Sequence, residues 1–169
     1  YAKDATTSNL LLPKHVYAKK GADFTGNNLE KKVTYNSYDI KGNITQYTTE
    51  NGIPVSLVWG YNNTMLIAKI ENMAYSSIPS TLVTAAQNAS NINNNEANLI
   101  VALNAIRNNA ALANAYVTTF TYRPLIGLSS VTDSKGDRIT YSYDSLNRLL
   151  WVKDKNGNIL SENQYNYKP

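Results

Sequence analysis

Side chains that could carry out catalysis are few in this sequence. His15 is the only histidine and cysteine is absent, which excludes a cysteine–histidine nucleophile, a disulfide framework and a thiolate or histidine-rich metal centre. A Ser–His–Asp triad would have to use His15, but the sequence lacks the Gly-x-Ser-x-Gly turn that exposes such a serine. We therefore interpret His15 as a structural residue of a strand or loop.

Four aspartates recur in similar surroundings and are the remaining candidates for acid–base or ion-binding chemistry. An aspartate can accept hydrogen bonds from the backbone of a turn, and glycine adopts the positive φ that many turns require. Because repeated parts rarely form a single active site, we interpret these carboxylates as turn caps and predict no catalytic residue. The repeated units are Tyr38-Asp39 with Gly42 and Asn43, Asp133 with Gly136, Tyr143-Asp144, and Asp154 with Gly157.

The segment Asp154-x-Asn156-Gly157-Asn158 has the oxygen-rich composition of a calcium-binding loop. It lacks the later glutamate that completes such a loop, so we predict an ordinary turn. No other group of residues suggests a metal or a cofactor, and we expect none to be bound.

Two tryptophans are candidates for stacking on sugars, provided that their rings are exposed. Trp59 alternates with Ile53, Val55 and Leu57 and therefore shares one face of a strand with them. We predict that Trp59 packs in the core. Trp151 is the second candidate, and carbohydrate binding by the sheet face remains an alternative.

The aspartates belong to a unit of turn and strand that repeats along the chain. Gly136 and Gly157 lie 21 residues apart, and Tyr122, Tyr143 and Tyr165 follow at intervals of 21 and 22 residues. A fixed period of this length is typical of architectures in which each unit buries its apolar face on its neighbours. The alternation within each unit predicts antiparallel β-strands.

The strand pattern is interrupted once. Before the interruption, Asn51-Gly52 indicates a tight hairpin and Gly60-Tyr61 ends the next strand. Apolar residues then recur at helical spacing, with Leu82, Ala85, Ala86, Ala89 and Ile92 on one predicted helix and Leu99, Leu103, Ile106 and Ala110 on the next. These two helices predict an inserted α-helical hairpin.

The chain therefore divides into four predicted parts. Pro13 predicts an edge position or a bend within a strand over residues 10–18, and residues 19–28 carry the glycines of a loop. The parts are a lead-in with an edge strand (1–28), β-repeats (29–76), the helical hairpin (77–115) and the C-terminal β-repeats (116–169).

The charge pattern limits the classes of partner. Charged residues are 17% of the chain and the net charge is +4, but the basic residues are scattered rather than arranged in a stripe. This is typical of a solvated mixed surface and argues against nucleic-acid binding. No apolar run approaches the ~18 residues that span a bilayer, so we expect any membrane association to be indirect. The chain starts at Tyr1 without methionine, and we expect it to be part of a longer or processed polypeptide.

These motifs resemble a known family. Tyr38-Asp39-x-x-Gly42-Asn43, Tyr143-Asp144-x-x-Asn147-Arg148-Leu149 and Asp154-x-x-Gly157-Asn158 are similar to the tyrosine-aspartate (YD) repeats of the RHS family of large surface and secreted proteins. Residues 51–72 resemble, more specifically, the C-terminal part of RHS-like proteins of Bacteroidota, which also carry a helical insertion here. The likeness covers roughly residues 10 to 169.

The resemblance implies a long antiparallel sheet that spirals into a hollow shell. A piece of this size is too short to close a large shell, so we expect it to extend the parent shell or to complete the sheet of a partner protein. The implied location is secreted or cell-surface, outside the outer membrane, with a role in adhesion, gliding-type motility or delivery of cargo. Self-processing is an alternative: many members cut themselves near the end of the shell, and Arg123-Pro124-Leu125-Ile126-Gly127-Leu128 has a passing likeness to that motif. Arginine stands there where aspartate is expected.

Overall fold

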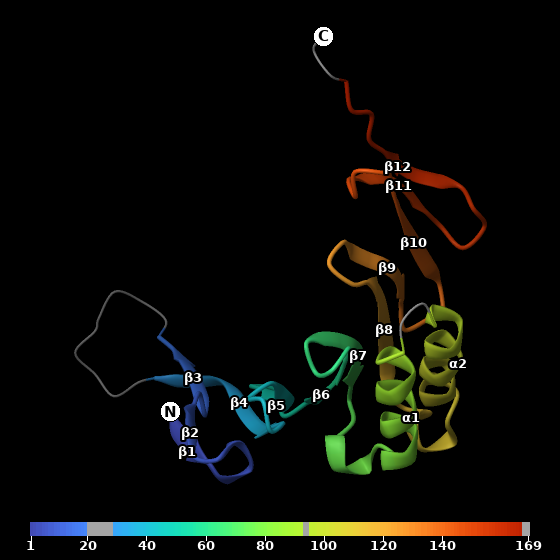
Figure 1. The fold of residues 1–169 in the computed structure, drawn as a ribbon. Helices are drawn as coiled ribbons and strands as arrows, with labels where there is room; N and C mark the ends of the chain where they lie inside the picture. Colours follow the sequence, from blue (N-terminus) through green and yellow to red (C-terminus); the bar gives the residue numbers. More distant parts are fainter. Residues whose placement is uncertain (20–28, 93–94, 167–169) are drawn as a thin grey trace.

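The computed structural model describes residues 1–19, 29–92 and 95–166. Within these ranges the main feature is a ten-stranded antiparallel sheet in which the strands lie in chain order, from β3 at one edge to β12 at the other (Figure 1). This confirms the predicted mainly β, antiparallel fold with two inserted helices. The strands are β3 (His15–Ala18), β4 (Glu30–Tyr38), β5 (Ile44–Thr49), β6 (Pro54–Gly60), β7 (Met65–Glu71), β8 (Tyr116–Arg123), β9 (Gly127–Thr132), β10 (Arg138–Tyr143), β11 (Leu149–Lys153) and β12 (Ile159–Glu162).

The N-terminal segment forms a separate small sheet. Strands β1 (Ala2–Asp4) and β2 (Leu10–Leu12) pair with each other around the 3-10 helix η1 (Ala5–Thr7). Pro13, which lacks a backbone N–H, separates β2 from β3, so the bend expected within residues 10–18 divides that segment between two sheets. Most of the loop predicted over residues 19–28 lies outside the described residues.

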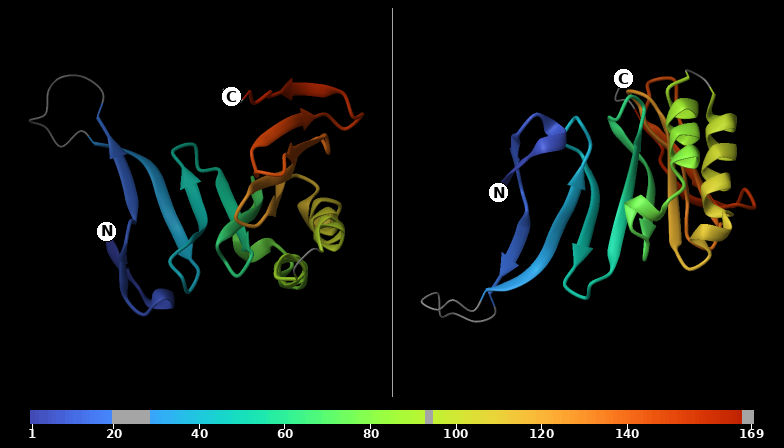
Figure 2. Two further views of the ribbon diagram at one scale, coloured as in Figure 1. Left: turned by 45° about the horizontal axis from the view of Figure 1, so that its top comes forward. Right: turned by 90° about the horizontal axis from the view of Figure 1, so that it is seen from below.

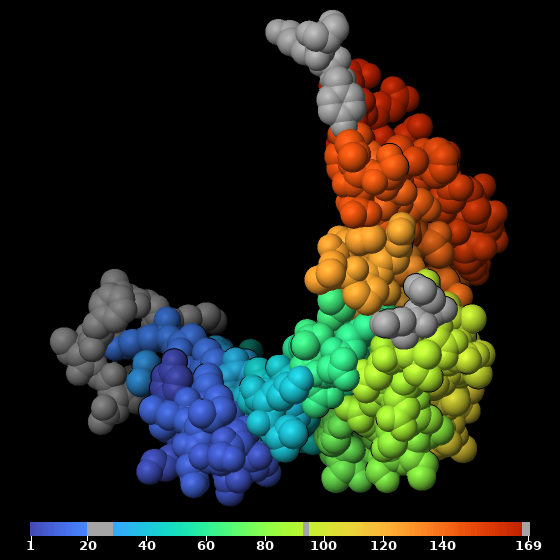
Figure 3. Space-filling view, in the orientation of Figure 1, coloured from blue at the N-terminus to red at the C-terminus, as the bar shows by residue number. Residues whose placement is uncertain are grey.

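The helical segment lies between β7 and β8 in the chain. It comprises η2 (Tyr75–Ser77), α1 (Ser80–Ser90), α2 (Glu96–Arg107) and η3 (Ala110–Leu112). The two α-helices lie side by side on one face of the sheet (Figure 2). The sheet bends at this point, and the helices cover the outer side of the bend while the opposite side is hollow (Figure 3).

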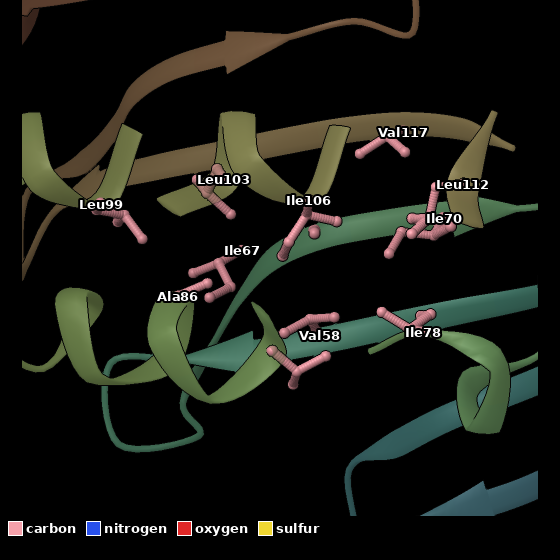
Figure 4. Close-up of a cluster of buried hydrophobic side chains, with 12 residues drawn as sticks. Val58, Ile67, Ile70, Ile78, Ala86, Leu99, Leu103, Ile106, Leu112 and Val117 are labelled. Carbon is pink, nitrogen blue, oxygen red and sulfur yellow. The ribbon is translucent and has the colours of Figure 1, made fainter. Parts of the chain in front are cut away.

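The hydrophobic core lies between these helices and strands β6 to β8 (Figure 4). Its fully buried members include Val58, Ile67, Ile70, Leu103 and Ile106. On β6 the small residues Ser56 and Gly60 flank Val58 on the same face, and they let the helices approach closely. A Cβ atom at Gly60 would lie 2.5 Å from the hydroxyl oxygen of Ser90 in α1.

The prediction for β6 was therefore wrong in part, because the helices cover the other face of the strand. On the predicted face, Val55 is buried at 3% exposure, Trp59 and Leu57 are half-buried, and Ile53 is 44% exposed. Trp59 and Leu57 face the hollow side, whereas Val58 and the small residues Ser56 and Gly60 face the helices. Volume, rather than hydrophobicity, decided which face the helices could cover.

The predicted buried faces of the two helices agree with the structure to different degrees. In α2 the predicted Leu99, Leu103 and Ile106 are all buried. In α1 the predicted Ala86 is buried and the predicted Leu82 and Ala89 pack against the core, whereas the predicted Ala85 and Ile92 are exposed. Val83 and Ser90 complete the buried face. Ala110 is also exposed, in the short helix η3. The close approach of Ser90 to Gly60 turns α1 toward the sheet in a way that hydrophobic spacing alone does not reveal.

Candidate functional site

The four aspartate turns share one geometry. In each turn, Oδ1 of the aspartate accepts hydrogen bonds from the backbone N–H groups two and four residues later, at 2.8 to 2.9 Å. The residue three positions after the aspartate has a positive φ, which favours glycine or asparagine. These residues are Gly42, Gly136, Asn147 and Gly157, after Asp39, Asp133, Asp144 and Asp154 respectively. Each carboxylate thus caps its own turn.

In three of the turns the hydrogen bonds lower the pKa of the carboxyl group and favour its charged form. The backbone N–H of Asp137 lowers the pKa of Asp133, and the backbone N–H of Arg148 lowers the pKa of Asp144. For Asp154 the largest cause of the lowered pKa is the side-chain amide of Asn158. A carboxylate stabilised in this way is a poor proton donor near neutral pH, since general acids need a pKa near the working pH.

The fifth residue of each turn makes a further side-chain contact. Asn43, Arg148 and Asn158 each donate a side-chain hydrogen bond back to Oδ2 of their own aspartate, at 2.7 to 2.9 Å. The corresponding Asp137 accepts a hydrogen bond from Lys155 of the Asp154 turn instead, at 2.6 Å. The contact between Lys155 and Asp137 therefore joins the Asp154 turn to the Asp133 turn.

A second repeated contact joins a tyrosine at the end of a repeat unit to the backbone of an earlier strand. Tyr143 donates a hydrogen bond to the carbonyl oxygen of Leu128 at 2.8 Å, and Tyr165 donates to that of Leu149, also at 2.8 Å. Arginine side chains stack on both tyrosine rings, with Arg123 over Tyr143 and Arg148 over Tyr165.

Aromatic residues of the N-terminal strands make the same type of contact. The Trp59 indole donates to the carbonyl oxygen of Ile44 at 2.8 Å, and the Tyr38 hydroxyl donates to that of Pro13. Trp59 therefore acts as a cross-strand clip on the hollow side of the sheet, outside the hydrophobic cluster. The contact uses the one polar atom of the indole ring.

Tyr61 lies in the turn between β6 and β7 and connects this turn to β8. Its hydroxyl accepts a hydrogen bond from the backbone N–H of Tyr122 at 2.9 Å and donates to the Tyr122 carbonyl at 3.2 Å. Its own backbone N–H donates to Ser90 Oγ in α1 at 2.9 Å.

Asn51 and Gly52, which were predicted to form a tight hairpin turn, are both exposed, and Gly52 has a φ of 77°.

Two charged residues fasten α2 to β8 and β9. Glu96 in the first turn accepts hydrogen bonds from Thr121 and Ser129, at 2.6 and 2.8 Å. Arg107 in the last turn donates to the carbonyl oxygens of Val117 and Thr132, at 2.7 and 3.2 Å. Both charges also suit the helix macrodipole. Sequence reasoning missed them, although an acid at the start and a base at the end of a predicted helix was a usable signal.

Partial burial lowers the pKa of Arg107, with the nearby Asp133 opposing that effect. His15 Nδ1 lies 3.3 Å from Thr34 Oγ1, and burial, Lys31 and Lys14 lower the pKa of His15.

In the segment with a likeness to the self-processing motif, Leu125 is fully exposed and has a φ of 66°. It forms the β8–β9 turn, where the Ile126 N–H donates to the Arg123 carbonyl at 3.0 Å.

Two cavities flank the helices. One, of about 420 Å³, lies beside Glu96, Tyr61 and Arg123. The other, of about 570 Å³, lies between the end of α2 and the sheet face of β9 to β11. Across the described ranges, no three histidine or acidic side chains come together to hold a metal ion. None of the described helices has the length and apolar character needed to cross a membrane.

The outer edges of the sheet are open within the described residues. Strand β12 pairs only with β11, and β3 pairs only with β4. All four residues of β12 are exposed, including Ile159 at 54% and Leu160 at 57%. Unpaired backbone groups on such an edge can receive a further strand.

Comparison with known families identifies the C-terminal part of this sheet. The RHS Repeat family matches residues 127–161, which contain β9, β10, β11, most of β12 and three of the four aspartate turns. This stretch is therefore similar to an RHS repeat. The Asp39 turn lies outside the match and has the geometry of the three turns within it. No curated protein matches the chain. The narrower resemblance, to proteins of Bacteroidota, stays a prediction.

Proposed function

We propose that this chain is a non-catalytic structural and interaction module of a secreted or cell-surface protein, and that its sheet extends or completes a longer β-shell. One observation carries the proposal: the unit next to the open edge at β12 repeats the turn and the tyrosine contacts of the unit before it. Tyr165 repeats the hydrogen bond and the arginine stacking of Tyr143, 22 residues earlier.

The open edge has the features of an interface between repeats. In a repeat protein each unit is stabilised by its own structure and by contact with its neighbours. Strand β12 has a neighbour on one side only, and its apolar residues Ile159 and Leu160 are more than half exposed. A further strand placed against β12 would satisfy backbone groups and cover these side chains.

The shape of the sheet supports a shell. The strands follow one another without a crossover, and the sheet bends around a hollow side (Figure 3). Coiling of such a sheet leaves open edges only at its two ends. The partner we propose is therefore another run of YD strands, from the parent polypeptide or from a second surface protein.

The role of the aspartates favours a structural function over a catalytic one. Oδ1 of Asp39, Asp133, Asp144 and Asp154 accepts two backbone hydrogen bonds in every case. Both oxygens of Glu96, the carboxylate beside the Arg123–Pro124 cavity, accept hydrogen bonds from hydroxyl groups. Adhesion, motility or cargo delivery would then depend on what the shell presents or contains.

The proposal can be tested by adding one repeat. A second copy of residues 144–165, inserted directly after Tyr165, keeps the spacing between Tyr143 and Tyr165. If the β12 edge accepts a further repeat, the extended chain should unfold in one transition at a higher temperature than the original. The added segment should also resist proteolysis.

A matched control is an insertion in which the copy carries lysine at the positions of Leu150 and Val152. These two residues alternate on β11, so the change removes apolar side chains from one face of the added strand. The control should be cleaved within the insertion. Equal protease sensitivity of the two insertions, with unchanged melting temperature, would contradict the proposal.

A further inference from the structure

The cavity beside the end of α2 is lined by four cationic side chains and one carboxylate. We propose that it binds a carboxylate-bearing sugar, a uronic acid unit of an acidic glycan. The cavity measures about 570 Å³, within the range of roughly 300 to 1,000 Å³ that is usual for small-ligand sites. This inference is independent of the shell, since it uses neither β3 nor β12.

Positive charge dominates the lining. It contains Arg107, Arg138, Lys153 and Lys155, with Asp154 as the acidic member. Both oxygens of Asp154 are already used within its own turn, by backbone N–H groups and by the amide of Asn158. The cavity therefore holds more positive charge than its own carboxylate offsets, and an anion entering it would be attracted.

Two of the four cations are committed to structural contacts. Arg107 donates to backbone carbonyls of β8 and β9, and Lys155 pairs with Asp137 at 2.6 Å. They contribute charge to the cavity, while the terminal nitrogens of Arg107 and the ammonium group of Lys155 bond to the protein.

The other two cations are positioned to bind. The Nε of Arg138 donates to Thr132 Oγ1 at 3.2 Å, which orients the guanidinium group, and within the described residues its two terminal nitrogens are left for a ligand. Lys153 Nζ lies 4.8 Å from the ring centroid of Trp151. Thr140 pairs with Lys153 across β10 and β11, so Arg138, two residues before Thr140, lies on the same face as Lys153. This arrangement lets the planar guanidinium group of Arg138 and the ammonium group of Lys153 bind the same carboxylate.

The neutral part of the lining indicates the class of ligand. Asn104, Asn108, Thr132 and Thr140 also line the cavity. Amide and hydroxyl side chains both donate and accept hydrogen bonds, and sugar hydroxyl groups do the same. The charged oxygens of a phosphate ion only accept hydrogen bonds and would use only the donors of this lining. Lys153 covers one face of Trp151, so recognition here rests on charge and hydrogen bonds rather than on ring stacking.

The test is titration of the 169-residue chain with trigalacturonic acid, followed by NMR chemical shifts and calorimetry. Maltotriose, which is neutral, and inorganic phosphate serve as comparison ligands. The uronate should bind more tightly than either, should shift the amide signals of Thr140 and Lys153, and should bind more weakly as salt is added.

Three variants locate the binding. Arg138→Gln and Lys153→Gln should each weaken trigalacturonate binding by about tenfold or more, because each removes a charged hydrogen-bond donor. Lys31→Gln removes the same charge from β4 and should change the affinity less than about twofold. Circular dichroism spectra would establish that all three variants are folded.

Failure of trigalacturonate to bind at millimolar concentration would overturn the inference, as would binding that is insensitive to both cavity substitutions. Phosphate binding as tightly as the uronate would overturn the assignment to a sugar. None of these results depends on the edge at β12, so they leave the proposed shell function to its own test.

Discussion

The hydroxyl oxygen of Tyr143 occupies the space that a side chain at Gly127 would fill. A Cβ atom built on Gly127 would lie 2.4 Å from that oxygen and 3.1 Å from the ring carbon that carries it. The glycine begins β9, and the same tyrosine hydroxyl donates to the carbonyl of the next residue, Leu128. Gly127 is thus the position that lets a repeat tyrosine clip two strands together.

This contact predicts that Gly127→Ala destabilises the protein by about 1–3 kcal/mol, the usual cost of overpacking. Urea denaturation would measure the change. Removal of the Tyr143 hydroxyl relieves part of the clash, so the double variant with Tyr143→Phe should lose less stability than the sum of the two single variants. Additive effects would show that the two residues do not compete for the same space.

The core assignment makes a second prediction, on α2. Leu103 is 2% exposed beneath the helices, and Leu103→Ala should lower the free energy of unfolding by about 2–5 kcal/mol. Val101 lies two residues away and is 67% exposed, so Val101→Ala should change it by no more than about 0.5 kcal/mol. Similar losses for both variants would mean that α2 does not pack on the sheet through the Leu103 face.

The aspartate turns predict how stability depends on pH. The folded protein holds the pKa of Asp133, Asp144 and Asp154 below the usual value. A carboxylate with a lowered pKa in the folded state contributes its full stabilisation above its unfolded pKa, about 3.9, and loses it as the pH falls toward the folded value. Stability should therefore be level from neutral pH to about pH 5 and decline below that.

Denaturant titrations at a series of pH values would measure this dependence. Substituting asparagine for the three aspartates together should reduce stability at neutral pH and flatten the decline in acid. A variant with Asp137→Asn, which alters an exposed ion pair with Lys155, serves as the control and should keep the decline. An unaltered acid profile in the triple variant would contradict the capping role.

The turns and the antiparallel strands could be predicted from sequence because they depend on local chemistry. The aspartate caps its turn, and the residue three positions later takes a positive φ, so residue type and spacing fix both. Asn147 shows that the rule tolerates asparagine where the other turns have glycine. The regular return of Tyr122, Tyr143 and Tyr165 then gives the alternation of strands.

The faces of β6 and α1 could not be predicted in the same way. Both faces of β6 carry apolar residues, and the deciding feature is the small volume of Ser56 and Gly60 against Ser90. That contact joins residues about 30 positions apart and has no hydrophobic signature. The cationic cavity was missed for a related reason, because Arg107 and Arg138 come together only when α2 lies across the sheet.

Hydrogen exchange at β12 tests the central claim most directly. The measurement compares the backbone amides of Ile159–Glu162 in the original chain and in the chain with a second copy of residues 144–165 after Tyr165. The account predicts that exchange at β12 slows in the extended chain to rates comparable with those of β11, because β12 becomes an inner strand. Unchanged, rapid exchange at β12 in a folded extended chain would contradict the claim that this edge receives another repeat.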